Sequence, residues 1–159
     1  MPSIDEVAPA FLEMAHRIVW CTVATVSPSG TPSTRILHPV WEFDGGRLTG
    51  WIATSPTSPK AKDLDANPTV SLTYWDPTHD TCTATGAAIW ETTSEERQAG
   101  WDRFVNAPAP VGYLPSIIPQ WPSPDAPEFG ILRLEPTSLR LMDGSLMLRG
   151  EGRLLTWRA

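Results

Sequence analysis

The spacing of apolar residues changes period along the chain. From Ile4 to Ala15 apolar side chains recur at helical spacing, and Ser3 with Glu6 forms the capping box that begins such a helix. After this helix, short runs rich in β-branched and aromatic residues alternate with Gly, Pro, Asn and Asp, which is typical of strands joined by turns. The expected strands cover residues 18–26, 33–43, 47–54, 69–75, 80–91, 129–142 with an interruption at Pro136, 146–149 and 153–157.

Two further helices and a long loop complete the expected elements. A short helix is expected over residues 59–65, and a second over 94–105 with acidic residues in its first turn. Residues 108–127 contain seven prolines together with Tyr113 and Trp121, which favours a structured surface loop. Seven or eight short strands connected mainly as hairpins predict a small closed barrel with helical caps, and tight turns make the second and third strands neighbours.

Composition narrows the function classes. The 159 residues predict a single domain over residues 1–159, and 12 basic against 18 acidic residues give a net charge of −6, which argues against a nucleic-acid binder. The chain has no apolar run of membrane-spanning length and no basic secretory signal, so we expect a cytoplasmic protein that binds neither membrane nor nucleic acid. The two cysteines, Cys21 and Cys82, lie in strand-like runs and are expected to be buried free thiols.

The common catalytic motifs are missing from the sequence. It contains no GxGxxG, Walker, HExxH or GxSxG pattern, and its three histidines, His16, His38 and His79, are scattered. We therefore expect no metal site and assign no catalytic residue. If the protein is an enzyme, a bound cofactor supplies the difficult chemistry.

The only two lysines, Lys60 and Lys62, lie in one tripeptide of an acidic chain. They follow a loop with hydroxyl side chains at Thr54, Ser55 and Ser58, at the start of the expected short helix, and such a combination can bind a phosphate monoester. The alternative is that Ser58 caps the helix and the lysines are solvated. Arg35 lies among apolar residues of the expected second strand, from which it can approach the same loop.

These residues together amount to a resemblance. A helix, a hairpin ending in Gly-x-Pro, the embedded Arg35, and then T-x-x-x-S-P-K-A-K-D-L-x-x-N-P-x-V-S-L from Thr54 onward resemble the pyridoxamine 5′-phosphate oxidase-like family of flavin-binding split barrels. The closer similarity is to its short bacterial general stress protein branch. The most specific part runs from Ser58 to Leu72.

The resemblance implies a six-stranded antiparallel split β-barrel, mainly β with flanking helices, that forms a homodimer with FMN at the dimer interface. It implies that Arg35, Ser58 and Lys60 bind the FMN phosphate, with Lys62 at the surface. The resemblance also implies that Thr54 and Ser55 contact the phosphate or ribityl chain. It implies that the backbone of Arg35, Ile36, Leu37 and His38 faces the isoalloxazine, and that Thr81 of the second subunit contacts FMN.

Departures from the family pattern decide between activities. The vitamin enzyme has S-R-K where this chain has Ser58-Pro59-Lys60, a strand lysine where this chain has Val40, and a further basic C-terminal segment. Oxidation of pyridoxamine phosphate is therefore not expected.

The leading hypothesis is an FMN-dependent oxidoreductase that passes a hydride to or from a small-molecule substrate. The alternatives are a non-catalytic, stress-associated flavin-binding protein and a deazaflavin-dependent reductase of the same fold. The proline-rich loop is a candidate lid over the flavin, and packing across the dimer is its alternative role.

Overall fold

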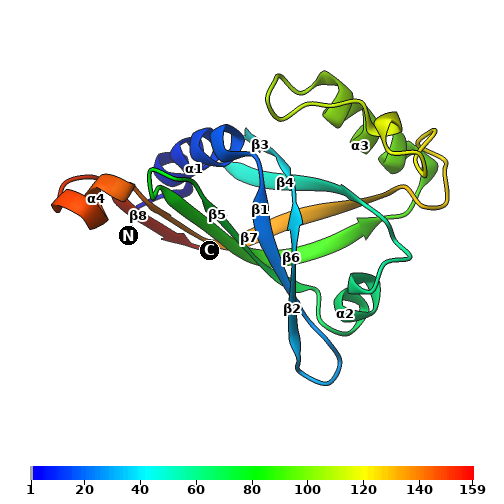
Figure 1. The fold of residues 1–159 in the computed structure, drawn as a ribbon, viewed down its shortest axis with the longest axis horizontal. Helices are drawn as coiled ribbons and strands as arrows, with labels where there is room; N and C mark the ends of the chain where they lie inside the picture. The colour runs from blue at the N-terminus through cyan, green and yellow to red at the C-terminus, as the bar shows by residue number, and fades with distance from the viewer. Residues whose placement is uncertain (1) are drawn as a thin grey trace.

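The computed structural model describes residues 2–159, which form eight strands, four α-helices and one 3₁₀ helix (Figure 1). The elements in chain order are α1 (Ile4–Ile18), β1 (Cys21–Val26), β2 (Pro32–Leu37), β3 (Val40–Asp44), β4 (Arg47–Thr54), α2 (Lys60–Ala66), β5 (Thr69–Trp75), β6 (Thr81–Glu91), α3 (Ser94–Asn106), η1 (Pro115–Ile117), β7 (Gly130–Met142), α4 (Gly144–Arg149) and β8 (Leu154–Arg158). None of the helices in this described part of the chain is both long and apolar enough to cross a bilayer.

All eight strands belong to one antiparallel sheet in the order β2-β1-β5-β6-β7-β4-β3, with β8 paired to β7. The two edge strands, β2 and β3, are separated in sequence only by His38 and Pro39. Three residue steps from Leu37 to Val40 span at most ~10 Å, so the sheet must curl until its edges approach each other at this corner. The expectation of a mainly β, antiparallel fold with flanking helices is confirmed, and the sheet has eight strands rather than six.

Two of the expected strands differ from the structure. The strand expected over residues 33–43 is divided at Pro39, which has no N–H to donate, so β2 pairs with β1 while β3 pairs with β4. The expectation that the whole second strand lies beside the third is therefore wrong. Residues 146–149 belong to helix α4 instead of a strand, because Gly150 takes a left-handed conformation with φ of 73° and closes a helical turn.

Pro136 does not end strand β7. The register between β6 and β7 shifts at Thr85 and Gly86, where Thr85 faces Ser138 and Gly86 faces Pro136. This bulge accommodates the proline within a strand of 13 residues. Gly86 is required at the bulge, since a Cβ there would collide with the backbone of Glu135.

The main core lies between α1 and the concave side of the sheet. Val7, Phe11 and Met14 on one face of α1 are fully buried against it. The Phe11 ring stands edge-on to Trp41 with centroids 5.1 Å apart, and the Trp41 indole donates a hydrogen bond of 2.9 Å to the Tyr74 hydroxyl. The expected buried free thiols are confirmed at Cys21 and Cys82, and burial raises the pKa of Cys21 to about 12.

A second core covers the other side of β4 and β7. Helix α3 and residues 107–129 pack there around Phe104, Trp121 and Phe129, with the Trp121 and Phe129 rings 5.5 Å apart. Figure 1 shows α3 and this segment at one end of the molecule, away from α4 and β8. The proline-rich segment is therefore a packed structural element, as expected of a structured loop.

Candidate functional site

Two cations approach each other where β4 leads into α2. Lys60, the first residue of α2, is only 8% exposed, and its ammonium donates a hydrogen bond of 2.5 Å to the Ser58 hydroxyl. Burial lowers the pKa of Lys60, and the positive charge of nearby Arg35 lowers it further. Because two positive charges that are partly buried repel each other, a bound anion would stabilise both.

Arg35 is held by the backbone of its own and the neighbouring strand. Its Nη1 donates to the carbonyl oxygens of Val23, at 3.1 Å, and Ser33, at 3.2 Å, and its Nη2 donates to the Ser33 hydroxyl at 2.9 Å. A guanidinium has five N–H groups, so two remain after these three bonds. Burial lowers the pKa of Arg35, and Asp63 opposes this effect. The geometry leaves part of a rigid guanidinium fork for a ligand oxygen.

Asp63 positions Arg35 and was given no role by the sequence. Its carboxylate lies 4.0 Å from the Arg35 guanidinium and accepts hydrogen bonds from Thr25, at 2.6 Å, and Ser33, at 3.3 Å. The carboxylate comes from α2, three residues after Lys60, and reaches β1 and β2. With Arg35 and Lys60 it leaves a local charge of +1, which suits a single phosphate group.

Hydroxyl contacts fix the loop before α2. Ser58 does not cap the helix: Pro59 occupies the cap position, and the Ser58 hydroxyl donates to the Ser55 carbonyl at 2.7 Å. The hydroxyls of Ser55 and Thr57 donate to the carboxylate of Glu128, at 2.7 and 2.6 Å, so the loop is tied to the end of the proline-rich segment. These hydrogen bonds lower the pKa of Glu128, which therefore stays ionised as an acceptor at neutral pH.

A cavity of about 510 Å³ lies beside this loop, within the usual range of small-molecule sites. Its lining is mostly aliphatic and aromatic and contains no Asp, Glu, Lys or Arg. It consists of Val19, Trp20, Ile36, Leu37, His38, Ala53, Thr54, Pro110, Tyr113, Ile117, Ile118 and Trp121. The cavity therefore lies between the β2–β3 corner, the end of β4 and the proline-rich segment.

His38 joins the β2–β3 corner of the sheet to the proline-rich segment. Its Nε2 lies 2.5 Å from the carbonyl oxygen of Val111, and because a carbonyl only accepts, this nitrogen carries the proton. Burial lowers the pKa of His38, so the ring is neutral at physiological pH. Its ring centroid lies 5.0 Å from that of Trp20 and 5.1 Å from that of Tyr113. The resulting aromatic cluster forms one wall of the cavity.

The structure brings most of the expected site residues into this region. Ile36, Leu37, His38 and Thr54 line the cavity. Arg35 lies on β2 beside Ile36, Ser55 and Ser58 lie on the loop after β4, and Lys60 begins α2. Thr81 is not part of the cavity lining: it begins β6 and pairs with Trp75 and Met142. Lys62 is exposed, as expected. Trp20 and Val111 are not among the residues expected from the sequence, because their positions depend on contacts over long sequence separations.

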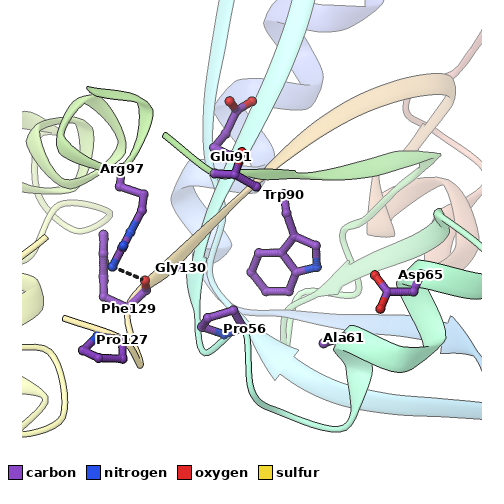
Figure 2. Close-up of a pocket in the computed structure, with 10 residues that line it drawn as sticks. Pro56, Ala61, Asp65, Trp90, Glu91, Arg97, Pro127, Phe129 and Gly130 are labelled. Atoms are coloured by element: carbon purple, nitrogen blue, oxygen red, sulfur yellow. Dashed lines mark hydrogen bonds between the residues drawn. The ribbon is translucent and has the colours of Figure 1, made fainter. Parts of the chain in front are cut away.

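A smaller cavity of about 330 Å³ lies on the other side of the same loop, beside Pro56 (Figure 2). Figure 2 shows the Trp90 ring facing this space and Arg97 at its edge. The Arg97 guanidinium donates to the carbonyls of Ala126, at 2.5 Å, and Phe129, at 2.9 Å, so it fixes the end of the proline-rich segment. Within residues 2–159 no cluster of three or more His, Cys, Asp or Glu side chains could hold a metal ion.

A family model described as pyridoxamine 5′-phosphate oxidase matches residues 6–143. No curated protein sequence matches significantly. Among solved structures, a Clostridium acetobutylicum protein related to general stress protein 26 has a TM-score of 0.71 at 13% identity, with 99% of this chain and 96% of that chain covered.

Two other structures have similar folds. A pyridoxamine 5′-phosphate oxidase-related, FMN-binding protein from Nostoc punctiforme has a TM-score of 0.67 at 19% identity, with 100% of this chain and 97% of that chain covered. A heme-binding protein from Mycobacterium smegmatis has a TM-score of 0.67 at 18% identity, with 99% of this chain and 59% of that chain covered. At these identities the likeness shows the fold alone.

Proposed function

Because the chain belongs to the pyridoxamine 5′-phosphate oxidase family, we propose that it is an FMN-binding oxidoreductase that acts on a small molecule. Arg35, Ser58 and Lys60 bind the phosphate of FMN. Thr54 and the backbone of residues 36–38, which border the large cavity, hold the remainder of the cofactor beside it. When bound, FMN supplies hydride transfer, which few protein acids or bases need to assist.

The observation that carries this proposal is the pair formed by Arg35 and Lys60. Burial lowers the pKa of each, and the charge of Arg35 lowers that of Lys60 further. In a protein of net charge −6, Lys60 is only 8% exposed and Arg35 is half-buried, and Thr54 and Ile36, which stand close to them in the chain, line an uncharged cavity. A phosphate monoester next to a large, mostly apolar ring system is the ligand class that fits both halves.

The neighbouring residues make the cavity wall neutral and mostly apolar. His38 is neutral and uses its N–H to hold Val111, while Trp20, Ile118 and Trp121 supply apolar surface along the walls. Such an environment strengthens the interaction of any polar group that enters it. The protein's own contribution is therefore binding, orientation and exclusion of solvent.

The first test is ligand binding by the purified full chain. We expect an absorption spectrum of bound flavin, and FMN should bind at least ten times more tightly than riboflavin, which lacks the phosphate. Equal affinity for FMN and riboflavin would refute the phosphate site. A heme Soret band with no flavin uptake would instead favour a heme-binding function, and uptake of deazaflavin but not FMN would favour the deazaflavin-dependent alternative.

The second test is turnover. The FMN-loaded protein is mixed with NADPH and an artificial electron acceptor, and consumption of NADPH is followed. Sustained turnover above that of free FMN supports an oxidoreductase. The alternative of a non-catalytic, stress-associated flavin protein would be favoured by tight FMN binding without turnover. Turnover must then be absent with NADPH, with NADH and with protein whose flavin has been reduced by dithionite.

We also propose that the protein is a homodimer through the outward face of β1, β2, β5 and β6. Register places Ile36 and Trp75 on this face, and Trp20 immediately precedes β1; the three side chains are 59%, 54% and 59% exposed. Up to Ile89 in β6, no outward position of these four strands carries a charge. Most of the other outward positions are hydroxyl residues, namely Thr22, Thr34, Thr69, Ser71, Thr73, Thr81, Thr83 and Thr85. A large exposed face with apolar residues and no charge is typical of an interface.

Substitution of Thr83 tests this interface. Light scattering should give about 35 kDa for the wild type, twice the 17.5 kDa of the chain, and a lower, monomeric mass for Thr83→Arg. Thr49→Arg is the matched control, because Thr49 lies on β4 in a groove that already holds Glu42 and Arg47. A monomeric wild type, or equal masses for both variants, would rule out this interface.

A further inference from the structure

Two histidines hold the β2–β3 corner, the residues 38–41 at which one edge strand of the sheet leads into the other. Strand β3 pairs with β4 alone, so the amide groups on its outer side have no neighbouring strand to meet. One of them, the N–H of Trp41, donates a hydrogen bond of 2.9 Å to Nε2 of His16 in the last turn of α1. At the other end of the corner, His38 is bonded to the carbonyl of Val111. The corner is therefore tied to α1 by one ring and to the proline-rich segment by the other.

The two rings are used in opposite senses. A backbone N–H only donates, so His16 must keep Nε2 free of a proton and carry its single proton on Nδ1. His38 carries its proton on Nε2, because the Val111 carbonyl only accepts. A second proton leaves the His38 bond in place, since Nε2 still donates, but in His16 it occupies the nitrogen that accepts. Acid therefore breaks one bond of the pair and spares the other.

Loss of the His16 acceptor would affect the main core. Trp41 is 2% exposed, and its ring stands edge-on to Phe11 and donates to the Tyr74 hydroxyl. Helix α1 packs against β3 at this point, and Figure 1 shows the two elements beside each other. Protonation of His16 would leave the Trp41 amide without its partner and place a charge at a half-buried position. Both effects are unfavourable, so the contact between α1 and the corner should loosen in acid.

The charged groups around His16 leave its neutral form favoured. Burial lowers the pKa of His16, and a positive charge on His38 lowers it further. The other charges on the neighbouring elements have partners: Arg17 pairs with Glu13, Asp76 and Asp80, and Glu42, on the opposite face of β3 from Trp41, contacts Trp51 and Arg103. The C-terminal end of α1 favours a cation, which keeps protonation within reach of mild acid.

We propose that His16 is a positioning residue of the proposed flavin site: its neutral ring latches the β2–β3 corner, and its protonation in mild acid releases the corner and weakens cofactor binding. This inference rests on the proposed function, because Leu37 and His38, at the start of the corner, border the cavity given to the flavin. His16 is not part of the cavity lining. It therefore acts on the cofactor through Trp41 and the corner rather than by contact.

Nitrogen NMR of the imidazole rings in the flavin-free full chain tests the latch directly. At pH 7.5, His16 should carry its proton on Nδ1 and His38 on Nε2, with signals assigned by their loss in His16→Gln and His38→Gln. The His16 ring should titrate below the usual histidine value of about 6.5, and the Trp41 amide signal should shift with it. A proton on Nε2 of His16, or a Trp41 amide that does not respond to the titration, would overturn the proposal.

The variant His16→Gln removes the titration and keeps an acceptor, since a glutamine carbonyl can receive the Trp41 N–H. The neutral ring stabilises the fold above about pH 6.5, and this stability is lost as the pH falls through the lowered pKa. From pH 7.5 to pH 5 the melting temperature of the wild type should therefore fall about 2–4 °C more than that of His16→Gln. An equal fall in both proteins would contradict the latch.

His79→Asn is the matched control for the loss of a histidine. His79 lies in the β5–β6 turn with φ of 66°, a conformation that asparagine tolerates, and its ring has no hydrogen bond to another residue within 2–159. This variant should keep the pH dependence of the wild type. If it lost that dependence as His16→Gln does, the effect would not belong to the corner and the proposal would fail.

Cofactor binding separates the latch from the proposed function. The FMN dissociation constant is measured at pH 7.5 and pH 5 for the wild type and His16→Gln. The phosphate of FMN titrates near about pH 6 and affects both proteins alike, so the wild type should weaken at least threefold more than the variant. Equal weakening would mean that the corner does not position the cofactor, against the proposal. Failure of the proposed function would look different: neither protein would bind FMN at pH 7.5, and the imidazole titration would still decide whether the latch exists.

Discussion

Replacement of Lys60 by methionine is the sharpest perturbation of the proposed phosphate site. Lys60→Met removes the ammonium and retains an unbranched side chain that can fill the same buried space. The hydrogen bond to Ser58 is lost, but no opposite charge is left unpaired, because the ionic neighbour of Lys60 is the like-charged Arg35. The change therefore removes a ligand contact with little damage to the fold.

The expected magnitude follows from the type of contact. A charge-assisted hydrogen bond to a phosphate contributes about 1.5–3 kcal/mol, so FMN binding should weaken roughly 10- to 150-fold. Riboflavin has no phosphate, and its affinity should change less than twofold. Lys62→Met is the matched control: Lys62 is exposed one step further along α2, and its loss should alter neither affinity by more than about twofold.

The stability of the flavin-free protein gives an independent check. Burial and Arg35 lower the pKa of Lys60, so its charged form is less favourable in the folded than in the unfolded chain. The cost is present at neutral pH, begins to fall as the pH rises through the lowered pKa, and is gone only above the ordinary pKa of lysine in the unfolded chain. Lys60→Met should therefore keep or raise the melting temperature at pH 7. Flavin fluorescence titration and thermal unfolding measure the two effects.

Two results would refute the reasoning. If Lys60→Met weakens FMN and riboflavin equally, Lys60 does not contact the phosphate. If Lys62→Met has the larger effect on FMN, the phosphate lies elsewhere on α2. Replacement of Arg35 by alanine is a poorer test, since Arg35 holds the backbone at Val23 and Ser33 and faces the buried Asp63.

Three further predictions concern the scaffold. His38→Ala removes the hydrogen bond to Val111, so hydrogen exchange should become faster across residues 107–121 and stay unchanged in β5; equal rates would show that the bond does not hold the segment. Hydrogen bonds from Arg153 lower the pKa of Asp143 against the effect of burial. Asp143→Asn should therefore lower the free energy of unfolding by less than about 1 kcal/mol at pH 7. This difference from wild type should vanish as the pH falls through the lowered pKa. Gly86→Ala places a methyl group against the facing backbone at the β6–β7 bulge and should cost about 1–3 kcal/mol in urea unfolding, whereas an unchanged midpoint would mean that the bulge relaxes.

The local parts of the fold could be predicted from the sequence, because their signals lie within a few residues. The amphipathic face of α1, the short helix after the lysine loop and the alternation in β5 depend on spacing alone. Helix α4 was mistaken for a strand because Leu146 to Arg149 is apolar enough for either structure. The deciding feature is the left-handed Gly150, whose φ a sequence does not state.

The candidate site could be predicted best where one motif contains it. Ser58 and Lys60 stand two residues apart in one loop, so their proximity follows from the chain itself. Asp63 stands in the same motif, but its contact with Arg35 depends on how α2 lies against β1 and β2. The bond between His38 and Val111 joins residues 73 positions apart and depends on the packing of α3 and the proline-rich segment. No local pattern encodes such a contact.

The two substitutions that set this chain apart from the vitamin enzyme act together. Pro59 stands where that enzyme has an arginine, and Val40 stands where it has a strand lysine. Val40 is 5% exposed and packs in the second core, so an apolar group occupies the place of a cation. At the proposed site, the phosphate of FMN would then rely on Arg35 and Lys60. Both losses therefore make the proposed FMN affinity depend on these two cations, and Lys60 is the one of the two that can be replaced without disturbing backbone contacts.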